Sequence, residues 1–232
     1  MLKKLGILGV IKHYACLIFG IALMGASVAL AKIALLGTSP ISSVPNVLSE
    51  VSNLTIGQWT IIFNFLLVVL EWIVLRHNFT FLNVVQLLPS MLFGALIDWF
   101  VKLFSFIKLP NYGVQIGLTL LSIVLLATGV FFEVNSRTIM MAGEGISFAF
   151  AYVLRIAFSR MKVRSDITMV IGAVIIGLLF SHQLIGVREG TVLSALLSGR
   201  IVGFIELHMP RLTHWVRDDQ DNTPNQPAMA DR

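Results

Sequence analysis

Charged residues are scarce in this sequence: only 12% of its 232 residues are Asp, Glu, Lys or Arg, whereas 56% are hydrophobic. Soluble domains carry about 25% charged residues. A water-soluble fold with this composition would expose large apolar patches and aggregate. The shortage of charge therefore excludes an ordinary soluble domain and predicts an all-α, polytopic membrane helix bundle whose main partner is the lipid bilayer.

Cysteine and catalytic motifs are also missing. The single cysteine, Cys16, cannot form an intrachain disulfide, and no zinc-like spacing surrounds it. The sequence has no His-Glu-x-x-His, Gly-x-Ser-x-Gly or P-loop motif. We therefore expect no enzyme activity, no metal site and no cofactor. The net charge of +5 does not indicate nucleic-acid binding, because the basic residues are dispersed at the ends of apolar runs.

Six apolar stretches meet or approach the roughly 20 residues that a membrane span requires. They cover residues 11–35, 57–76, 82–107, 113–137, 166–186 and 190–209. The first follows Lys3 and Lys4 and mimics a secretory signal, but it is too long for one, so we expect it to stay attached. Residues 11–209 are predicted to form a single membrane domain, with 1–10 as a cytoplasmic segment and 210–232 as a disordered polar cytoplasmic tail.

Two shorter elements begin with glycine, at 37–50 and 143–158. The first is too polar to cross alone, and we expect a short helix that starts near Ser39 or Pro40. If both elements are re-entrant or half helices, the chain has six spans and two inverted halves. If both cross, it has eight spans and parallel halves. The six-span alternative keeps slightly more positive charge on the side of the N-terminus, and we favour it.

The two halves resemble each other, which predicts an internal repeat of about 11–107 and 113–209. Pairing each residue with the one 108 positions later aligns Asp98 with Glu206, and a shift of 106 aligns Gly37 with Gly143. The order of elements is also the same in both halves: a long helix, a glycine-led short helix and two further helices.

Several short motifs resemble the bacterial YczE/YitT group of integral membrane proteins. They are Leu36-Gly37-Thr38-Ser39-Pro40, Thr55-Ile56-Gly57-Gln58-Trp59 leading into Asn64, Gly94-Ala95-Leu96-Ile97-Asp98, and the Gly-Thr start of the last helix at Gly190-Thr191. The resemblance covers residues 15–208, although Ile41 stands where that group has a bulky residue. It implies a multi-pass protein of the bacterial cytoplasmic (inner) membrane but no particular substrate.

Lys32 and Arg137 each precede the glycine motif of their half by five or six residues. Each could place a cation beside the N-terminus of a short helix, which itself carries about half a positive charge. Two such ends that meet near mid-membrane would suit an anionic group. The alternative is that the glycines only allow close packing and the cations face lipid headgroups. The predicted substrate-binding residues are Lys32, Gly37, Thr38, Ser39, Pro40, Asn64, Arg137, Gly143, Glu144 and Gly145.

Asp98 and Glu206 are candidate coupling carboxylates, because ionisable groups at membrane depth cost about 2.5–3.5 kcal/mol each. Both lie near span ends, so a simple interfacial role is an equal alternative. Ala195, Gly199 and Gly203 recur every four residues and predict a flat stripe for helix packing, with a homodimer as a special case.

The leading functional hypothesis is a secondary transporter of a small solute, with an anion favoured over a cation. The alternative is a non-transporting membrane subunit or scaffold that binds a partner protein.

Overall fold

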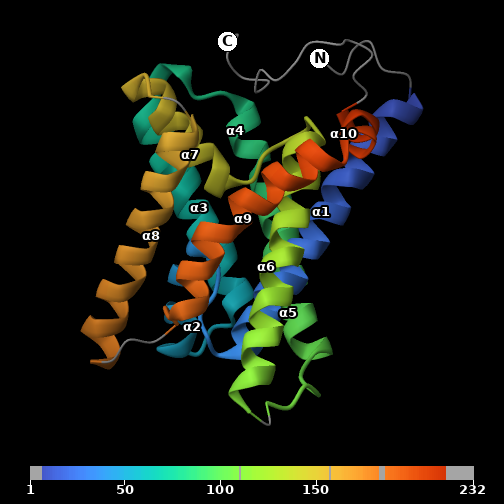
Figure 1. Cartoon of the computed structure of the whole chain (residues 1–232). Coiled ribbons are helices and arrows are strands. Elements are labelled where there is room, and N and C mark those ends of the chain that lie inside the picture. The colour runs from blue at the N-terminus through green and yellow to red at the C-terminus, as the bar shows by residue number, and fades with distance from the viewer. Residues whose placement is uncertain (1–6, 110, 157, 183–185, 218–232) are drawn as a thin grey trace.

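The long apolar stretches of the sequence become long helices in a computed structural model, which describes residues 7–109, 111–156, 158–182 and 186–217 (Figure 1). All secondary structure in these ranges is helical. The six long helices are α1 (Ile7–Ala34), α3 (Ile56–Leu75), α5 (Leu87–Leu103), α6 (Tyr112–Asn135), α8 (Phe158–Ser181) and α9 (Glu189–His208). Six stretches that coincide with most or all of these helices are long and apolar enough to cross a membrane. The protein is therefore a multi-pass membrane helix bundle, as predicted.

Two shorter helices, α2 (Pro40–Glu50) and α7 (Ala142–Leu154), correspond to the glycine-led elements. At 1.5 Å per residue they are about 16 and 20 Å long, too short for a hydrocarbon core of about 30 Å. They are half-helices, which favours the six-span alternative. In agreement with six spans, α1 begins and α9 ends at the same end of the bundle (Figure 1).

Helix boundaries follow local signals in the sequence. Helix α3 starts at Thr55, whose hydroxyl accepts the N–H of Gln58 while the Gln58 side chain accepts the N–H of Thr55. Helix α6 starts at Asn111, whose side chain accepts the N–H of Val114. Helix α2 starts after Ser39 as predicted, with Pro40 in its first turn, although the Ser39 side chain makes no capping bond. Helix α7 ends at Arg155, which adopts a left-handed conformation (φ 53°).

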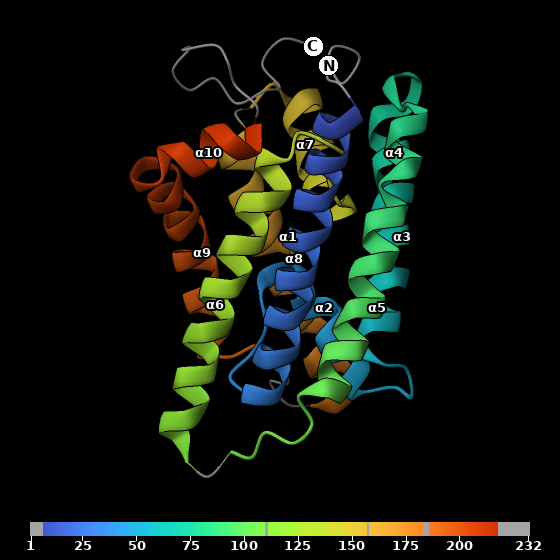
Figure 2. The same ribbon diagram turned by 90° about the vertical axis from the view of Figure 1, so that its right-hand side faces the viewer.

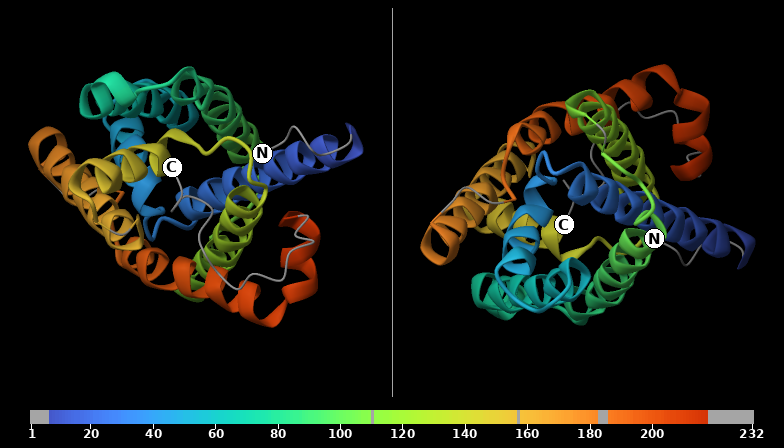
Figure 3. Two further views of the ribbon diagram at one scale, coloured as in Figure 1. Left: turned by 90° about the horizontal axis from the view of Figure 1, so that it is seen from above. Right: turned by 90° about the horizontal axis from the view of Figure 1, so that it is seen from below.

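The helices pack in a two-fold pattern that matches the predicted repeats. Helices α1 and α6, the first of each half, pack against each other, and each also packs against the last helix of its own half, α5 or α9. Each half-helix packs against the following helix of both halves, so α2 and α7 both contact α3 and α8. In the view along the bundle, α2 and α7 lie between the α3–α5 pair and helices α8 and α9 (Figure 3). The spans run in opposite directions in the two halves, so the halves are inverted (Figures 1 and 2).

The pattern breaks at one interface. Helix α3 packs closely against α5, whereas α8 and α9, their counterparts, are not among the packed helix pairs of the described residues. The α3–α5 contact depends on Gly57 and Gly94, because a Cβ on Gly94 would lie 2.6 Å from the carbonyl oxygen of Gly57. The backbones of α1 and α6 come similarly close at Gly20 and Gly129, where a Cβ on Gly20 would lie 2.7 Å from the carbonyl oxygen of Gly129. The α8–α9 side has no such glycine contact within the described chain.

The prediction of a disordered tail is wrong for its first eight residues. Residues Pro210–Arg217 form helix α10, which lies across the end of the bundle and contacts α1, α6 and α9 (Figure 2). Val216 is fully buried against Cys16 and Phe131, and Arg217 donates a hydrogen bond to Glu206. These contacts are tertiary, so the polar local sequence did not reveal them. Residues 218–232 lie outside the described residues.

Candidate functional site

The N-terminal ends of the two half-helices meet inside the bundle. A Cβ added to Gly143, in the first turn of α7, would overlap the side chain of Ile41, in the first turn of α2. From this contact α2 runs toward the end of the bundle where α1 stops, because its last residues reach Lys32 in the final turn of α1. Helix α7 runs to the opposite end, where α8 begins (Figure 1). We call the contact between Ile41 and Gly143 the half-helix junction; it is the meeting of helix ends that the sequence predicted.

Buried hydroxyl groups surround the start of α2. The backbone turns at Gly37 (φ 96°), against which Thr191 of α9 packs so closely that a Cβ on Gly37 would overlap its hydroxyl. The N–H of Gly190 donates to the carbonyl oxygen of Leu36 at 2.8 Å, which holds the start of α9 against this turn. Ser39 donates from its hydroxyl to that of Ser42 at 3.2 Å. Helix α9 thus adds polar groups to the α2 end of the site.

Carboxyl groups of the protein itself surround the start of α7. Glu133 of α6 accepts the N–H of Met141, the N-cap of α7, through Oε1 at 3.0 Å. Ser90 of α5 accepts the N–H of Ala142 at 3.4 Å. Glu144 lies in the first turn of α7, and its Oε1 is 3.4 Å from Nζ of Lys162. The position where a bound anion was predicted to meet α7 is therefore already taken by Glu133.

Buried side-chain oxygen atoms of six described residues have no hydrogen-bond partner. They belong to Thr38, Asn64, Glu133, Glu144, Thr191 and Ser194. Thr38 and Thr191 lie at the Gly37 turn, and Ser194 lies one turn further along α9 on the same face as Thr191. Asn64 donates to the carbonyl oxygen of Thr60 at 2.8 Å but leaves its own oxygen unpaired, on a helix that contacts both half-helices. Buried groups of this kind normally find a partner, so each is a point where a ligand or water could bind.

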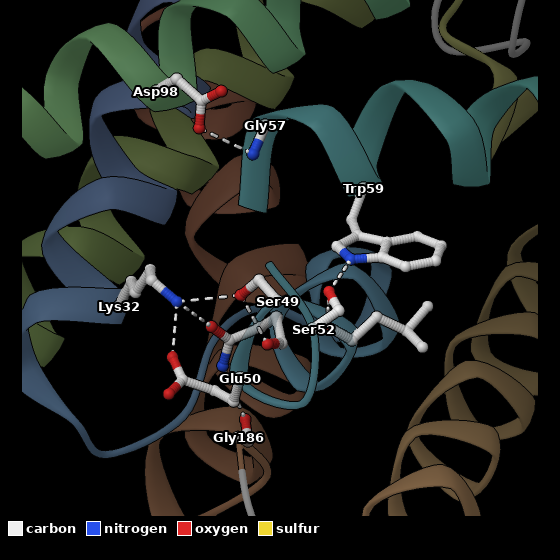
Figure 4. A network of polar contacts seen from close by, with 10 residues as sticks. Lys32, Ser49, Glu50, Ser52, Gly57, Trp59, Asp98 and Gly186 are labelled. Carbon is white, nitrogen blue, oxygen red and sulfur yellow. Dashed lines mark hydrogen bonds and ion pairs between the residues drawn. The ribbon is translucent and has the colours of Figure 1, made fainter. Parts of the chain in front are cut away.

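The prediction for Lys32 is wrong about its position. Its ammonium lies at the C-terminal end of α2, where it contacts Glu50 at 2.6 Å and Ser49 at 2.9 Å (Figure 4). Lys32 lies in the last turn of α1, at the end of the bundle. The chain then reverses direction before α2 begins, and the spacing of residues in the sequence did not reveal this reversal. Arg137 lies half-buried in the segment before α7 with φ 51°. Lys32 thus lies in the last turn of α1, whereas Arg137 lies beyond the end of α6 at Asn135.

Asp98 and Glu206 both lie near the ends of the bundle. Asp98 accepts a hydrogen bond from the N–H of Gly57 at 2.9 Å (Figure 4). It also accepts one from the Thr55 hydroxyl at 2.5 Å, so it caps α3. Glu206 is 2.9 Å from Arg217 of α10. An open pocket beside Asp98 is lined by Lys32, Thr55 and Lys102 among others. Both carboxylates have protein partners and are only half-buried, which matches the interfacial alternative better than a coupling role.

The stripe on α9 does not pack inside the described chain. A Cβ on Gly199 or Gly203 would meet no atom within 4 Å, and the same holds for Gly172 on α8. The sequence predicted helix packing at this stripe, but the glycines at which helix backbones come close in the described residues are Gly20, Gly57, Gly94 and Gly129.

The site residues predicted from the sequence omit three residues that the structure brings to the half-helix ends: Thr191, Ser194 and Lys162. The first two belong to the Gly-Thr start of the last helix, so the motif itself was the available signal. Lys162 lies among basic residues near the end of a span and was indistinguishable from a headgroup anchor. Glu133 was visible as an ionisable residue inside an apolar stretch, but its contact with α7 was not.

One family profile matches residues 11–207, and its description is a family of unknown function, DUF6198. The chain belongs to this family. The match covers all six spans and both half-helices, apart from the first residues of α1 and the last residue of α9. It does not name the YczE/YitT group, so that relation stays a prediction. Neither the curated proteins nor the solved structures contain a match.

Proposed function

We propose that this DUF6198 protein is a secondary transporter of a small polar solute in the cytoplasmic membrane of a bacterium. The observation that carries the proposal is the half-helix junction: two broken helices from inverted halves direct their N-terminal ends at each other inside the bundle. Secondary transporters place their substrates at such ends, where irregular backbone is sheltered by neighbouring helices.

The solute binds through hydrogen bonds rather than through a fixed positive charge. Thr38, Thr191 and Ser194 have hydroxyl groups without partners near the start of α2, and Asn64 has an unpaired carbonyl oxygen on α3. Lys32 is neutralised by Glu50 at the far end of α2, and Glu133 occupies the start of α7. An anion would therefore bind only at the α2 end, so we favour neutral or zwitterionic solutes over the anion suggested by the sequence.

Solute flux into proteoliposomes tests the proposal. The panel contains neutral polyols, amino acids and small carboxylates, each offered separately. Flux of at least one solute is expected, and loss of that flux is expected for Thr191→Val, which removes a hydroxyl without changing the volume of the side chain. Lys32→Ala should leave flux unchanged.

Two glycine substitutions provide a matched pair. Gly143→Val places a side chain into Ile41 at the junction and should reduce flux at least tenfold, about 1.4 kcal/mol in the barrier. Gly199→Val adds the same atoms to a helix position with no neighbour within 4 Å and should leave flux unchanged. Equal flux for both variants, or no flux of any solute by the native protein, would contradict the proposal.

The second candidate function is a membrane subunit that binds a partner helix. The exposed Gly199 and Gly203 on α9 favour it, because small residues let two backbones approach closely in lipid. A stoichiometric partner recovered in mild detergent, together with absence of flux, would favour this function; Gly199→Leu should then release the partner.

A further inference from the structure

Two buried carboxyl groups lie at the start of α7. Only 3% of the surface of Glu133 and 6% of that of Glu144 is exposed. Glu133 accepts the N–H of Met141, and the N–H of Glu144 donates to the carbonyl oxygen of the same Met141 at 3.1 Å. Both are thus fixed to a single turn of backbone. In each of them Oε2 is buried without a hydrogen-bond partner.

The surrounding charges do not neutralise this pair. Lys162 of α8 is 3.4 Å from Glu144, but it is closer to Asp166, at 2.8 Å, and so is shared between two carboxylates. The N-terminal end of α7 supplies only about half a positive charge. With all acids ionised, the group formed by Glu133, Glu144, Asp166 and Lys162 carries two negative charges in excess. A buried excess of this kind is costly unless a cation or proton joins it.

Other titratable groups face this region from the neighbouring elements. Glu71 of α3 accepts hydrogen bonds from Asn83 and Gln86. His13 of α1 contacts the carbonyl oxygen of Ser136 at 2.7 Å, and Arg137 follows directly in the chain. Glu71 has its own amide donors, which distinguishes it from the pair: its two oxygens are both occupied, whereas Glu133 and Glu144 each keep one oxygen free.

We propose that Glu133 and Glu144 share one exchangeable proton and form the proton-coupling site of the transporter. A proton fits better than a metal ion for two reasons. The ammonium of Lys162 beside Glu144 repels a second fixed cation, whereas a proton bonds covalently to a carboxyl oxygen. The described residues also contain no group of three or more His, Cys, Asp or Glu side chains that could hold a metal.

The coupling role rests on the proposed transport function, but the proton site does not. On protonation, an O–H bond forms on one Oε2 and the pair loses one negative charge; on release, that bond breaks and the proton passes to water. Glu144 lies next to Gly143, so this change in charge occurs beside the half-helix junction. Movement of a proton would thereby alter the energy of any arrangement in which α7 lies against α2.

Infrared difference spectroscopy of the protein in lipid nanodiscs tests the proton site directly, with a pH step as the only perturbation. The native protein should show a carbonyl-stretch band of one protonated carboxyl group that disappears as the pH is raised. Glu133→Gln or Glu144→Gln should remove or move this band, because it belongs to the pair. The control variants Asp98→Asn and Glu206→Gln, whose carboxylates are half-buried and hydrogen-bonded, should leave it unchanged.

A further variant keeps both carboxyl groups. Lys162→Gln removes the ammonium, so the proton should be retained to a pH at least one unit higher, a tenfold change in proton affinity. Absence of the band from the native protein, its persistence in both glutamine variants, or its loss in a control variant would each overturn the proton site.

Proton movement into proteoliposomes that contain a trapped pH-sensitive dye tests the coupling. Solute-dependent proton movement is expected for the native protein and its loss for Glu133→Gln. A titrating band without any solute flux would retain the proton site and overturn the transport function. Solute flux that is independent of pH and unchanged in Glu133→Gln would overturn the coupling alone.

Discussion

The crossing of α3 and α5 gives the sharpest test of how this bundle is held together. Gly57 and Gly94 bring the two backbones into contact, and Asp98 of α5 accepts the N–H of Gly57 at 2.9 Å. In Gly57→Ala, the new Cβ would overlap the carbonyl oxygen of Gly94 and the carboxylate of Asp98. The first obstacle is a backbone atom and the second is held by a hydrogen bond. Neither can move aside as a flexible side chain would, so the two helices must separate.

The expected loss of stability has two parts. Overpacking of this kind costs about 1–3 kcal/mol. Separation also lengthens the bond between Gly57 and Asp98, and a hydrogen bond to a charged group contributes about 1.5–3 kcal/mol, with the lower end suited to a half-exposed carboxylate. We expect a total loss of about 3–4 kcal/mol in the free energy of unfolding. At roughly 2–4 °C per kcal/mol, the Tm should fall by about 10 °C.

Gly199→Ala is the matched control, because the same methyl group is added to a helix interior where nothing lies within 4 Å. Replacing a helical glycine by alanine gains about 0.5–1 kcal/mol, so the Tm should rise by a few degrees. Thermal unfolding of both variants in one detergent, followed by intrinsic tryptophan fluorescence, gives the comparison. The reasoning is refuted if Gly57→Ala is as stable as Gly199→Ala.

Three other predictions concern polar and terminal contacts. Asp98→Ala should lower the free energy of unfolding by about 2 kcal/mol, because it removes the acceptor for Thr55 and Gly57; thermal unfolding checks this, and an unchanged Tm would refute it. Glu71→Ala should cost about 3 kcal/mol, since it leaves buried amide donors without an acceptor; a double-mutant cycle with Gln86→Leu should show coupling of at least about 0.5 kcal/mol. Val216→Asp should raise proteolytic cleavage near α10 at least about tenfold by undocking this helix, and an unchanged cleavage pattern would show that α10 is not anchored there.

The sequence by itself determined the class of fold and the six long apolar stretches, but it left open whether the chain has six or eight spans. Long apolar runs require a bilayer, and their limits fell within a few residues of the observed helices, except for α8, which starts eight residues before the predicted 166. Ser39 and Pro40 located the start of α2 through local backbone preferences. The first glycine-led element was recognised as a short helix from its length and polarity, whereas the sequence left open whether the second crosses the membrane.

Only the tertiary structure decided which groups meet. Lys32 was placed at the wrong end of α2 because spacing along the chain does not record the reversal at Leu35 and Gly37. The contact of Ile41 with Gly143 joins residues about a hundred positions apart, and the two free oxygens of Glu133 and Glu144 depend on how α6, α7 and α8 pack together. Hydrophobic periodicity determines that a helix lies in lipid, but the pairing of its polar atoms depends on neighbours supplied by distant parts of the chain.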